Sequence, residues 1–151
     1  MINVGIAGIG FMGLIHHLAY QRVRGARVTA YCSRNKKKLA GDWRGIKGNF
    51  GPPGTMTDLS RAATYRKLDD LLADDRVDLV DICLPPDKHA AATIAALKAG
   101  KHVFCEKPMA ITVEGCDRMI DAWRKSGKHL MIGFNMRYMN IFRGAIPGKV
   151  F

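Results

Sequence analysis

The stretch that decides the fold is Ile2-Asn3-Val4-Gly5-Ile6-Ala7-Gly8-Ile9-Gly10-Phe11-Met12-Gly13. Residues 2–7 form a short apolar run that ends at Gly8, which is typical of a buried strand. Apolar side chains at helical spacing follow from Met12 to Val23, so a helix is expected there. A G-x-G-x-x-G turn between a strand and a helix is typical of a dinucleotide-binding site.

Each glycine of this turn has an expected task. Gly8 permits the tight turn, Gly10 lets a pyrophosphate approach the backbone, and Gly13 lets the helix pack closely on the sheet. Together with Phe11 and Met12, these residues would face the pyrophosphate with the free N–H groups of the helix N-terminus. Two alternatives remain open: an ordinary strand-to-helix turn and the related loop of a methyltransferase.

The rest of the chain alternates between strand-like and helix-like segments. Further strands are expected at residues 27–32, 62–65, 77–84, 102–105 and 129–132, and helices at 36–40, 68–73, 87–99 and 112–126. The stretch from Gly41 to Thr57 is rich in glycine and proline and predicts a long loop, either functional or mobile. The alternation predicts an α/β fold: a Rossmann-type, doubly wound parallel sheet of about six strands with helices on both faces.

Length and composition restrict the class of protein. With 151 residues, of which 48% are hydrophobic and 25% charged, the chain suits one globular domain. No apolar run approaches the roughly 20 residues that cross a membrane, so no membrane partner is expected. The net charge of +11 raises the prospect of nucleic acid, but the basic residues are spread along the chain without interleaved aromatic residues. Nucleic acid is therefore not expected as a partner.

The four cysteines point to a reducing compartment. Cys32, Cys83, Cys105 and Cys116 form no C-x-x-C pair, and three of them lie in apolar strand-like runs. They are interpreted as reduced thiols of a cytoplasmic protein, and no metal site is expected.

The end of the second strand carries the signal for cofactor choice. Enzymes that use NAD usually place Asp or Glu there, against the ribose 2′-hydroxyl. This chain has Ser33 and Arg34, followed by three lysines that include Lys37, and no carboxylate between Ala26 and Gly41. A cationic cluster at this position suits a 2′-phosphate, so NADP(H) is favoured and NAD(H) is the alternative. If the chain binds NAD(H), these cations would be solvated surface groups.

Polar groups also follow the later strands, at the sheet edge where doubly wound folds bind ligands. Leu84 and Pro85 end one strand and His89 lies just beyond; Glu106-Lys107-Pro108 ends the next; Gly133-Phe134-Asn135 ends the last and precedes Arg137. Together with the glycine turn, these motifs resemble the successive motifs of the glucose–fructose oxidoreductase and inositol dehydrogenase (Gfo/Idh/MocA) family. The resemblance covers essentially the whole chain, and Glu-Lys-Pro is its most specific motif.

The resemblance implies roles for individual residues. Lys107 would lie near the nicotinamide and the substrate hydroxyl and assist proton transfer, which a lysine can do when neighbouring cations lower its pKa. Glu106 would position the cofactor, and the Lys107–Pro108 peptide bond would be cis. Leu84, Pro85 and His89 would line the nicotinamide side, and Asn135 and Arg137 would lie near the reactive end or support Lys107. His89 as a helix cap and Arg137 as a surface residue are the alternatives.

The resemblance also implies a larger protein. Residues 1–140 would form the NAD(P)-binding domain, and residues 141–151 would begin a C-terminal α/β domain that binds the substrate and supplies the family's catalytic histidine. The full-length enzyme, expected to be a homo-oligomer, would transfer hydride between the nicotinamide and a sugar, polyol or related alcohol. The chain alone is expected to be nearly inactive, and a non-catalytic cofactor-binding or regulatory module is the alternative.

Overall fold

The computed structural model describes residues 1–139, which alternate between strands and helices. In chain order the elements are β1 (Ile2–Ala7), α1 (Phe11–Tyr20), β2 (Ala26–Cys32), α2 (Lys36–Leu39), β3 (Ala63–Tyr65), α3 (Leu68–Leu72), β4 (Leu79–Ile82), α4 (Pro86–Lys98), β5 (His102–Cys105), α5 (Val113–Ser126), β6 (Leu130–Ile132) and the 3-10 helix η1 (Asn135–Tyr138). The expected boundary between residues 1–140 and 141–151 lies outside the described residues.

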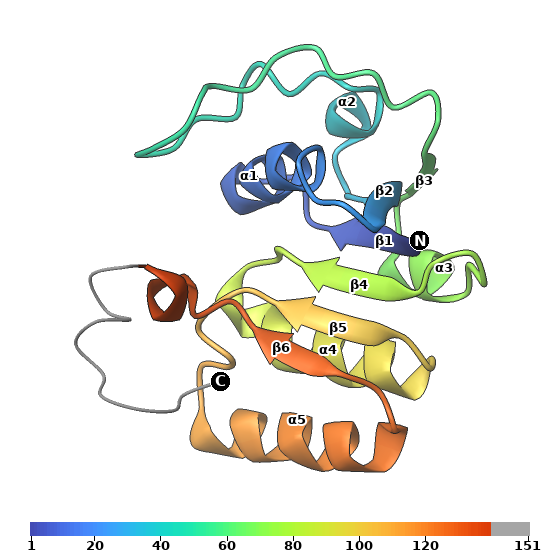
Figure 1. Ribbon diagram of the computed structural model, residues 1–151, viewed down its shortest axis with the longest axis vertical. Coiled ribbons are helices and arrows are strands. Elements are labelled where there is room, and N and C mark those ends of the chain that lie inside the picture. The colour runs from blue at the N-terminus through green and yellow to red at the C-terminus, as the bar shows by residue number, and fades with distance from the viewer. Residues whose placement is uncertain (140–151) are drawn as a thin grey trace.

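The strands form one six-stranded sheet in the order β3-β2-β1-β4-β5-β6, and every neighbouring pair is parallel. Helices α1 and α2 cover one face, and α3, α4 and α5 cover the other (Figure 1). Each face has its own apolar core, because successive side chains of a buried strand point to opposite faces. The sequence-based prediction of a Rossmann-type doubly wound sheet is confirmed.

Several element boundaries differ from those expected. Helix α1 ends at Tyr20 rather than Val23, because the N–H groups of Arg22 and Val23 bond three residues back and tighten the chain into a turn. Strand β4 covers only Leu79–Ile82 of the expected 77–84. The expected caps of α5 are present: the Thr112 hydroxyl accepts the N–H of Gly115 at 3.0 Å, and Gly127 has the left-handed conformation.

The long loop from Gly41 to Thr57 packs against α1 and is anchored by a tryptophan. The Trp43 side chain is fully buried and donates its indole N–H to the Lys38 carbonyl oxygen at 2.8 Å. Its ring meets His17 edge-on, and Phe50 from the same loop meets Phe11 edge-on. The loop therefore serves as an apolar cover for the first helix.

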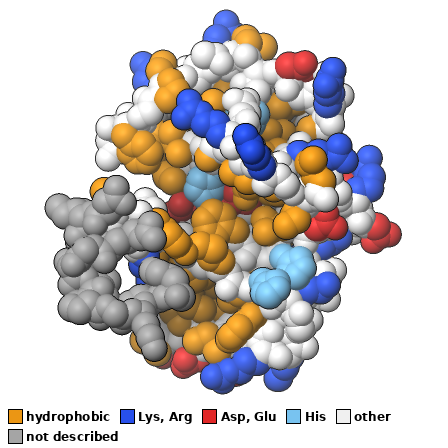
Figure 2. Space-filling model, viewed as in Figure 1, with side chains coloured by type: hydrophobic (Ala, Val, Ile, Leu, Met, Phe, Trp, Pro, Cys, Tyr) orange, Lys and Arg blue, Asp and Glu red, His pale blue; other side chains and the backbone are white. Residues whose placement is uncertain are grey.

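The surface agrees with a globular domain. Among the described residues, no helix is both long and apolar enough to cross a bilayer. On the face that Figure 2 shows, hydrophobic side chains occupy much of the middle, and Lys and Arg side chains lie mostly toward the rim.

Candidate functional site

A cleft of about 730 Å³ runs along the edge of the sheet where the strands end. It crosses the carboxyl ends of five neighbouring strands, from β3 through β2, β1 and β4 to β5. Five strands span about 19 Å at the usual spacing of about 4.8 Å, which suits an elongated ligand. This edge is where doubly wound sheets bind their ligands.

The middle of the cleft is the glycine turn after β1, where Gly8, Gly10, Phe11 and Met12 contribute to the lining. Gly8 has a φ of +105°, and a side chain on it would collide with the Cys83 carbonyl. A methyl group on Gly13 would collide with the Gly8 carbonyl oxygen, so α1 can approach β1 this closely only with glycine here. Gly10 has open space around it. The turn thus has the geometry that its sequence predicts.

One end of the cleft, which we call the β2–β3 end, is formed by Ser33, Arg34, Asn35, Lys38 and Arg66. The Lys38 ammonium donates to the carbonyl oxygen of Ile9 at 2.6 Å, which ties this end to the glycine turn. Arg34 and Arg66 are exposed. Three cations therefore gather at this end of the cleft.

The sequence predicts Lys37 at this end, but the lining contains Lys38 and not Lys37. The four-residue helix α2 explains the difference. Its Asn35 cap accepts the N–H groups of both Lys37 and Lys38, and the helical rotation of the next residue then directs Lys38 toward Ile9. Arg66, which follows the edge strand β3, was not singled out at all.

The opposite end, which we call the β4–β5 end, is formed by Leu84, Pro85, His89, Glu106 and Lys107. Lys107 is exposed, and its peptide bond to Pro108 is cis, as the family resemblance implies. The buried His89 ring lies with Nδ1 2.7 Å from the Pro108 carbonyl oxygen and Nε2 2.8 Å from that of Leu84. His89 thus joins the ends of β4 and β5, and both of its ring nitrogens are occupied in doing so.

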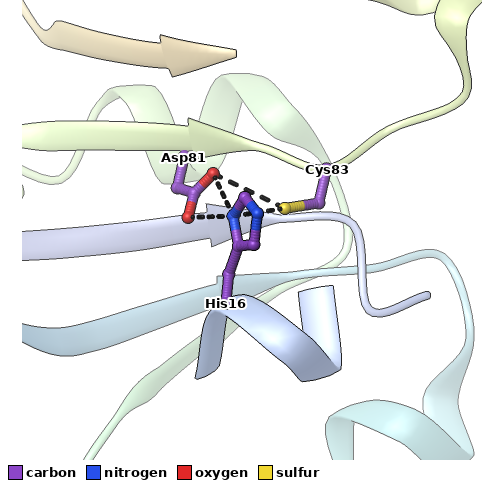
Figure 3. A group of neighbouring side chains, drawn as sticks. All are labelled: His16, Asp81 and Cys83. Carbon is purple, nitrogen blue, oxygen red and sulfur yellow. Dashed lines mark hydrogen bonds and ion pairs between the residues drawn. The ribbon is translucent and has the colours of Figure 1, made fainter. Parts of the chain in front are cut away.

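Beneath the β4–β5 end lies an ion network that the sequence does not reveal. Figure 3 shows two of its members, His16 and Asp81, with Cys83 beside them. His16 of α1 points at Asp81 of β4, with Nδ1 2.8 Å and 3.0 Å from the two carboxylate oxygens. Its Nε2 lies 3.1 Å from Glu106 Oε1, and Glu106 Oε2 accepts the Lys107 backbone N–H at 3.0 Å. We call His16, Asp81 and Glu106 the ion network.

Electrostatics make His16 a cation within this network. Burial alone would lower its pKa, but the hydrogen bonds and charges of Asp81 and Glu106 outweigh burial and raise the pKa to about 9. For Glu106, burial would raise the pKa, but His16, helped by Lys107, lowers it. Near neutral pH the network therefore holds an imidazolium between two carboxylates.

Three donor atoms of this region could in principle hold a metal ion: His16 Nδ1, an Asp81 oxygen and Cys83 Sγ lie within 4.8 Å of one another. The Cys83 sulfur is 3.3 Å from His16 Nδ1 and 3.5 Å from Asp81 Oδ1. Without a metal ion, burial and then the nearby Asp81 raise the pKa of the Cys83 thiol well above its usual value, so the thiol keeps its proton and can donate it toward Asp81. The contacts are those of a hydrogen-bonded network around an imidazolium.

Asn135 and Arg137 lie outside the cleft lining, although the resemblance placed them near the reactive end. After β6 the chain turns at Gly133 and enters η1, where both side chains are exposed. The Arg137 guanidinium lies over the Phe134 ring, 5.5 Å from its centroid. Among the described residues, neither side chain forms a hydrogen bond or an ion pair with Lys107.

With fold and cleft in place, comparison with known proteins identifies the family. The family model described as "Oxidoreductase family, NAD-binding Rossmann fold" (Gfo/Idh/MocA) matches residues 2–134. The chain belongs to the Gfo/Idh/MocA oxidoreductase family. Over the matched residues it has the NAD-binding Rossmann fold of that family.

Known proteins are similar to this chain over most of its length. Inositol 2-dehydrogenase of Salmonella typhimurium is 37% identical over 91% of this chain and 38% of that enzyme. A glycosyl hydrolase family 109 protein of Shewanella baltica is 34% identical over 99% of this chain and 33% of that protein. The crystal structure of scyllo-inositol dehydrogenase from Lactobacillus casei with bound NAD(H) and scyllo-inositol superposes with a TM-score of 0.78, at 25% identity, over 96% of this chain and 39% of that one. The chain thus spans well under half the length of these relatives.

Proposed function

We propose that this domain binds NADP(H) in preference to NAD(H), and that the enzyme it serves oxidises or reduces a sugar, polyol or related alcohol. In the proposed pose the pyrophosphate lies on the glycine turn, against the N-terminus of α1, whose first turn has no acidic residue. The adenosine ribose lies at the β2–β3 end, and the nicotinamide lies at the β4–β5 end. The order of the strand ends along the cleft supports this pose.

The observation that carries the NADP preference is the set of cations at the β2–β3 end. Arg34, Lys38 and Arg66 line it together with the Ser33 hydroxyl. The acidic residue of the lining is Glu106, at the opposite end of the cleft. A ribose 2′-phosphate would therefore meet cations and a hydroxyl, in a lining that has no carboxylate at this end.

For Lys107 we propose proton transfer to and from the substrate hydroxyl. A bound nicotinamide supplies or accepts the hydride, and the alcohol proton must move in the same reaction. The exposed Lys107 side chain extends from the β4–β5 end, where its neutral amine can accept the proton that the alcohol loses, and its ammonium can return that proton in the reverse direction. Its charged neighbour in these contacts is Glu106, whose pKa Lys107 helps to lower.

The polyol or sugar class of substrate rests on the relatives named above. Inositol dehydrogenases among them act on cyclic polyols by name. A cytoplasmic location is proposed because the four cysteines are free thiols. The homo-oligomeric state of the full-length enzyme stays a prediction.

Calorimetric titration of the chain with NADPH and NADH tests the cofactor assignment. We expect tighter binding of NADPH, and a loss of about tenfold or more for NADPH alone in Arg34→Ala, because a charge-assisted hydrogen bond is removed. Lys37→Ala is the matched control, since it removes a neighbouring cation outside the cleft and should leave both affinities unchanged. Equal binding of both cofactors by the unmodified chain would contradict the NADP preference, and binding of neither by a folded chain would contradict the pose.

A further inference from the structure

We propose that His16 and Asp81 are positioning residues: they hold the Glu106 carboxylate, and through it the main chain of Lys107, in place at the β4–β5 end. The proposal deepens the function proposed above, since it concerns the lysine that would handle the substrate proton. It assigns a role to a fully buried carboxylate and a half-buried histidine beneath the cleft.

A continuous line of contacts runs from the sheet to Lys107. Asp81 is fully buried at the centre of β4, and its two oxygens lie 2.8 Å and 3.0 Å from His16 Nδ1. The other ring nitrogen of His16 lies 3.1 Å from Glu106 Oε1. Glu106 Oε2 accepts the N–H of Lys107 at 3.0 Å. The line joins α1, β4 and the residue after β5, segments that are 65 and 90 residues apart along the chain.

The line fixes an orientation as well as a location. Glu106 is held at both carboxylate oxygens, so it cannot rotate without losing a charge-assisted hydrogen bond. On the far side of the cis peptide, His89 Nδ1 lies 2.7 Å from the Pro108 carbonyl oxygen. The Lys107–Pro108 unit is thus held from two sides, while the Lys107 side chain stays exposed above it.

His16 can serve both carboxylates only as an imidazolium, since a neutral ring has a single N–H. The groups that face it are Asp81 and Cys83 from the β4 side, Glu106 and Lys107 after β5, and Tyr20 of its own helix, whose pKa is raised by burial and then by Asp81. The Phe104 ring of β5 stacks on it at 5.4 Å between centroids. Loss of the His16 proton should therefore release one of the two carboxylates.

The main test measures the backbone amide of Lys107 by NMR hydrogen exchange, on the full chain without cofactor. In His16→Gln and Asp81→Asn we expect its protection factor to fall by about tenfold, because the carboxylate that accepts its N–H is freed. The amides of Cys83 and Gly133, which bond to Ala7 and Cys105 within the sheet, should keep their protection. His17→Gln is the matched control, because His17 neighbours His16 on α1 but bonds to the Tyr31 hydroxyl.

Two results of this exchange experiment would overturn the proposal. One is an unchanged Lys107 amide in folded His16→Gln and Asp81→Asn. The other is an equal loss of protection at Lys107, Cys83 and Gly133, which would show that His16 and Asp81 support the sheet as a whole.

The unmodified protein offers a second test that requires no substitution. Over a titration from about pH 6 to about pH 11, the His16 ring and the Lys107 amide should shift with one common midpoint, set by the pKa of His16 near 9. Asp81→Asn should move both midpoints down together. A Lys107 amide shift that does not follow His16, or one equivalent of a metal bound through Cys83, would overturn the proposal.

These measurements separate the positioning proposal from the proposed function. Both use the chain without cofactor, so they report on Lys107 whether or not NADPH binds. If NADPH does not bind preferentially but the Lys107 amide still responds to His16, only the cofactor assignment is wrong. If NADPH binds preferentially but the Lys107 amide does not respond to His16, only the positioning role of His16 and Asp81 is wrong.

Discussion

The two ends of the cleft are built in opposite ways. At the β2–β3 end, Arg34 and Arg66 are exposed, and the Asn35 cap and the Ser33 hydroxyl bond to backbone N–H groups within three residues along the chain. At the β4–β5 end, Glu106 is buried and depends on a histidine 90 residues earlier. One end offers exposed charge to a ligand, and the other fixes a charged group through a buried ion network.

Because the two ends are built differently, substitutions at each end should affect different properties of the protein. Exposed cations are screened by salt and contribute little to folding, so changes at the β2–β3 end should alter ligand affinity alone. Removing one partner of a buried ion pair leaves an uncompensated charge and destabilises the fold. Substitutions at the β4–β5 end should therefore alter both the stability of the protein and the geometry of the site. The three predictions below test this division, beginning with the turn that separates the two ends.

The largest effect is expected at the glycine turn. Gly13→Ala places a methyl group against the Gly8 carbonyl and should lower the free energy of unfolding by about 3 kcal/mol or more. Gly10→Ala, the matched control, meets open space and should change stability by less than about 0.5 kcal/mol while weakening cofactor binding. Urea unfolding of both variants measures the difference, and equal stabilities would refute the close approach of α1 to β1.

The next effect concerns pH and belongs to the β4–β5 end. The pKa of His16 is raised from 6.5 in the unfolded chain to about 9 in the folded one. The stabilisation is therefore fully present below pH 6.5 and is lost as the pH rises through 9, a change of about 3 kcal/mol. Urea unfolding between these pH values measures it.

His16→Gln should remove most of this pH dependence, whereas Arg34→Ala at the β2–β3 end should leave it intact. A stability that stays constant from pH 6.5 to pH 9 in the unmodified protein would show that the ion network does not hold a stabilised imidazolium.

The smallest effect is expected for the cation that the sequence analysis missed. Arg66→Ala should weaken NADPH binding by about threefold to tenfold, without a change in stability, because Arg66 is exposed and its contribution is partly screened. Lys67→Ala, which removes the neighbouring cation outside the lining, is the control. Raising the salt concentration should shrink the difference in NADPH affinity between Arg66→Ala and the unmodified chain. An equal loss of affinity in Lys67→Ala would show that Arg66 acts only through the overall positive charge of the surface.

The parts of this architecture that depend on a local pattern of residues could be predicted from the sequence. The turn from Gly8 to Gly13 could be predicted because its glycines, the strand before them and the helix after them are contiguous. The cation at the end of β2 could be predicted to within one residue, but the choice of Lys38 over Lys37 depends on the rotation of a single helical turn.

The ion network could not be predicted from local pattern, because its members come from distant segments. One signal was present in the sequence: Asp81 interrupts an otherwise apolar strand, and a buried carboxylate needs a partner. Which residue would provide it depends on the packing of α1 over β4. Asn135 and Arg137 lie outside the cleft lining for a similar reason, since the path of the chain after β6 decides which way they face.

A crystal structure of the chain with NADPH tests the central claim most directly, since that claim is the direction of the cofactor along the cleft. We predict the 2′-phosphate among Ser33, Arg34 and Arg66, the pyrophosphate on the glycine turn, and the nicotinamide beside Glu106 and Lys107. A 2′-phosphate away from these cations, or a nicotinamide at the β2–β3 end, would contradict it.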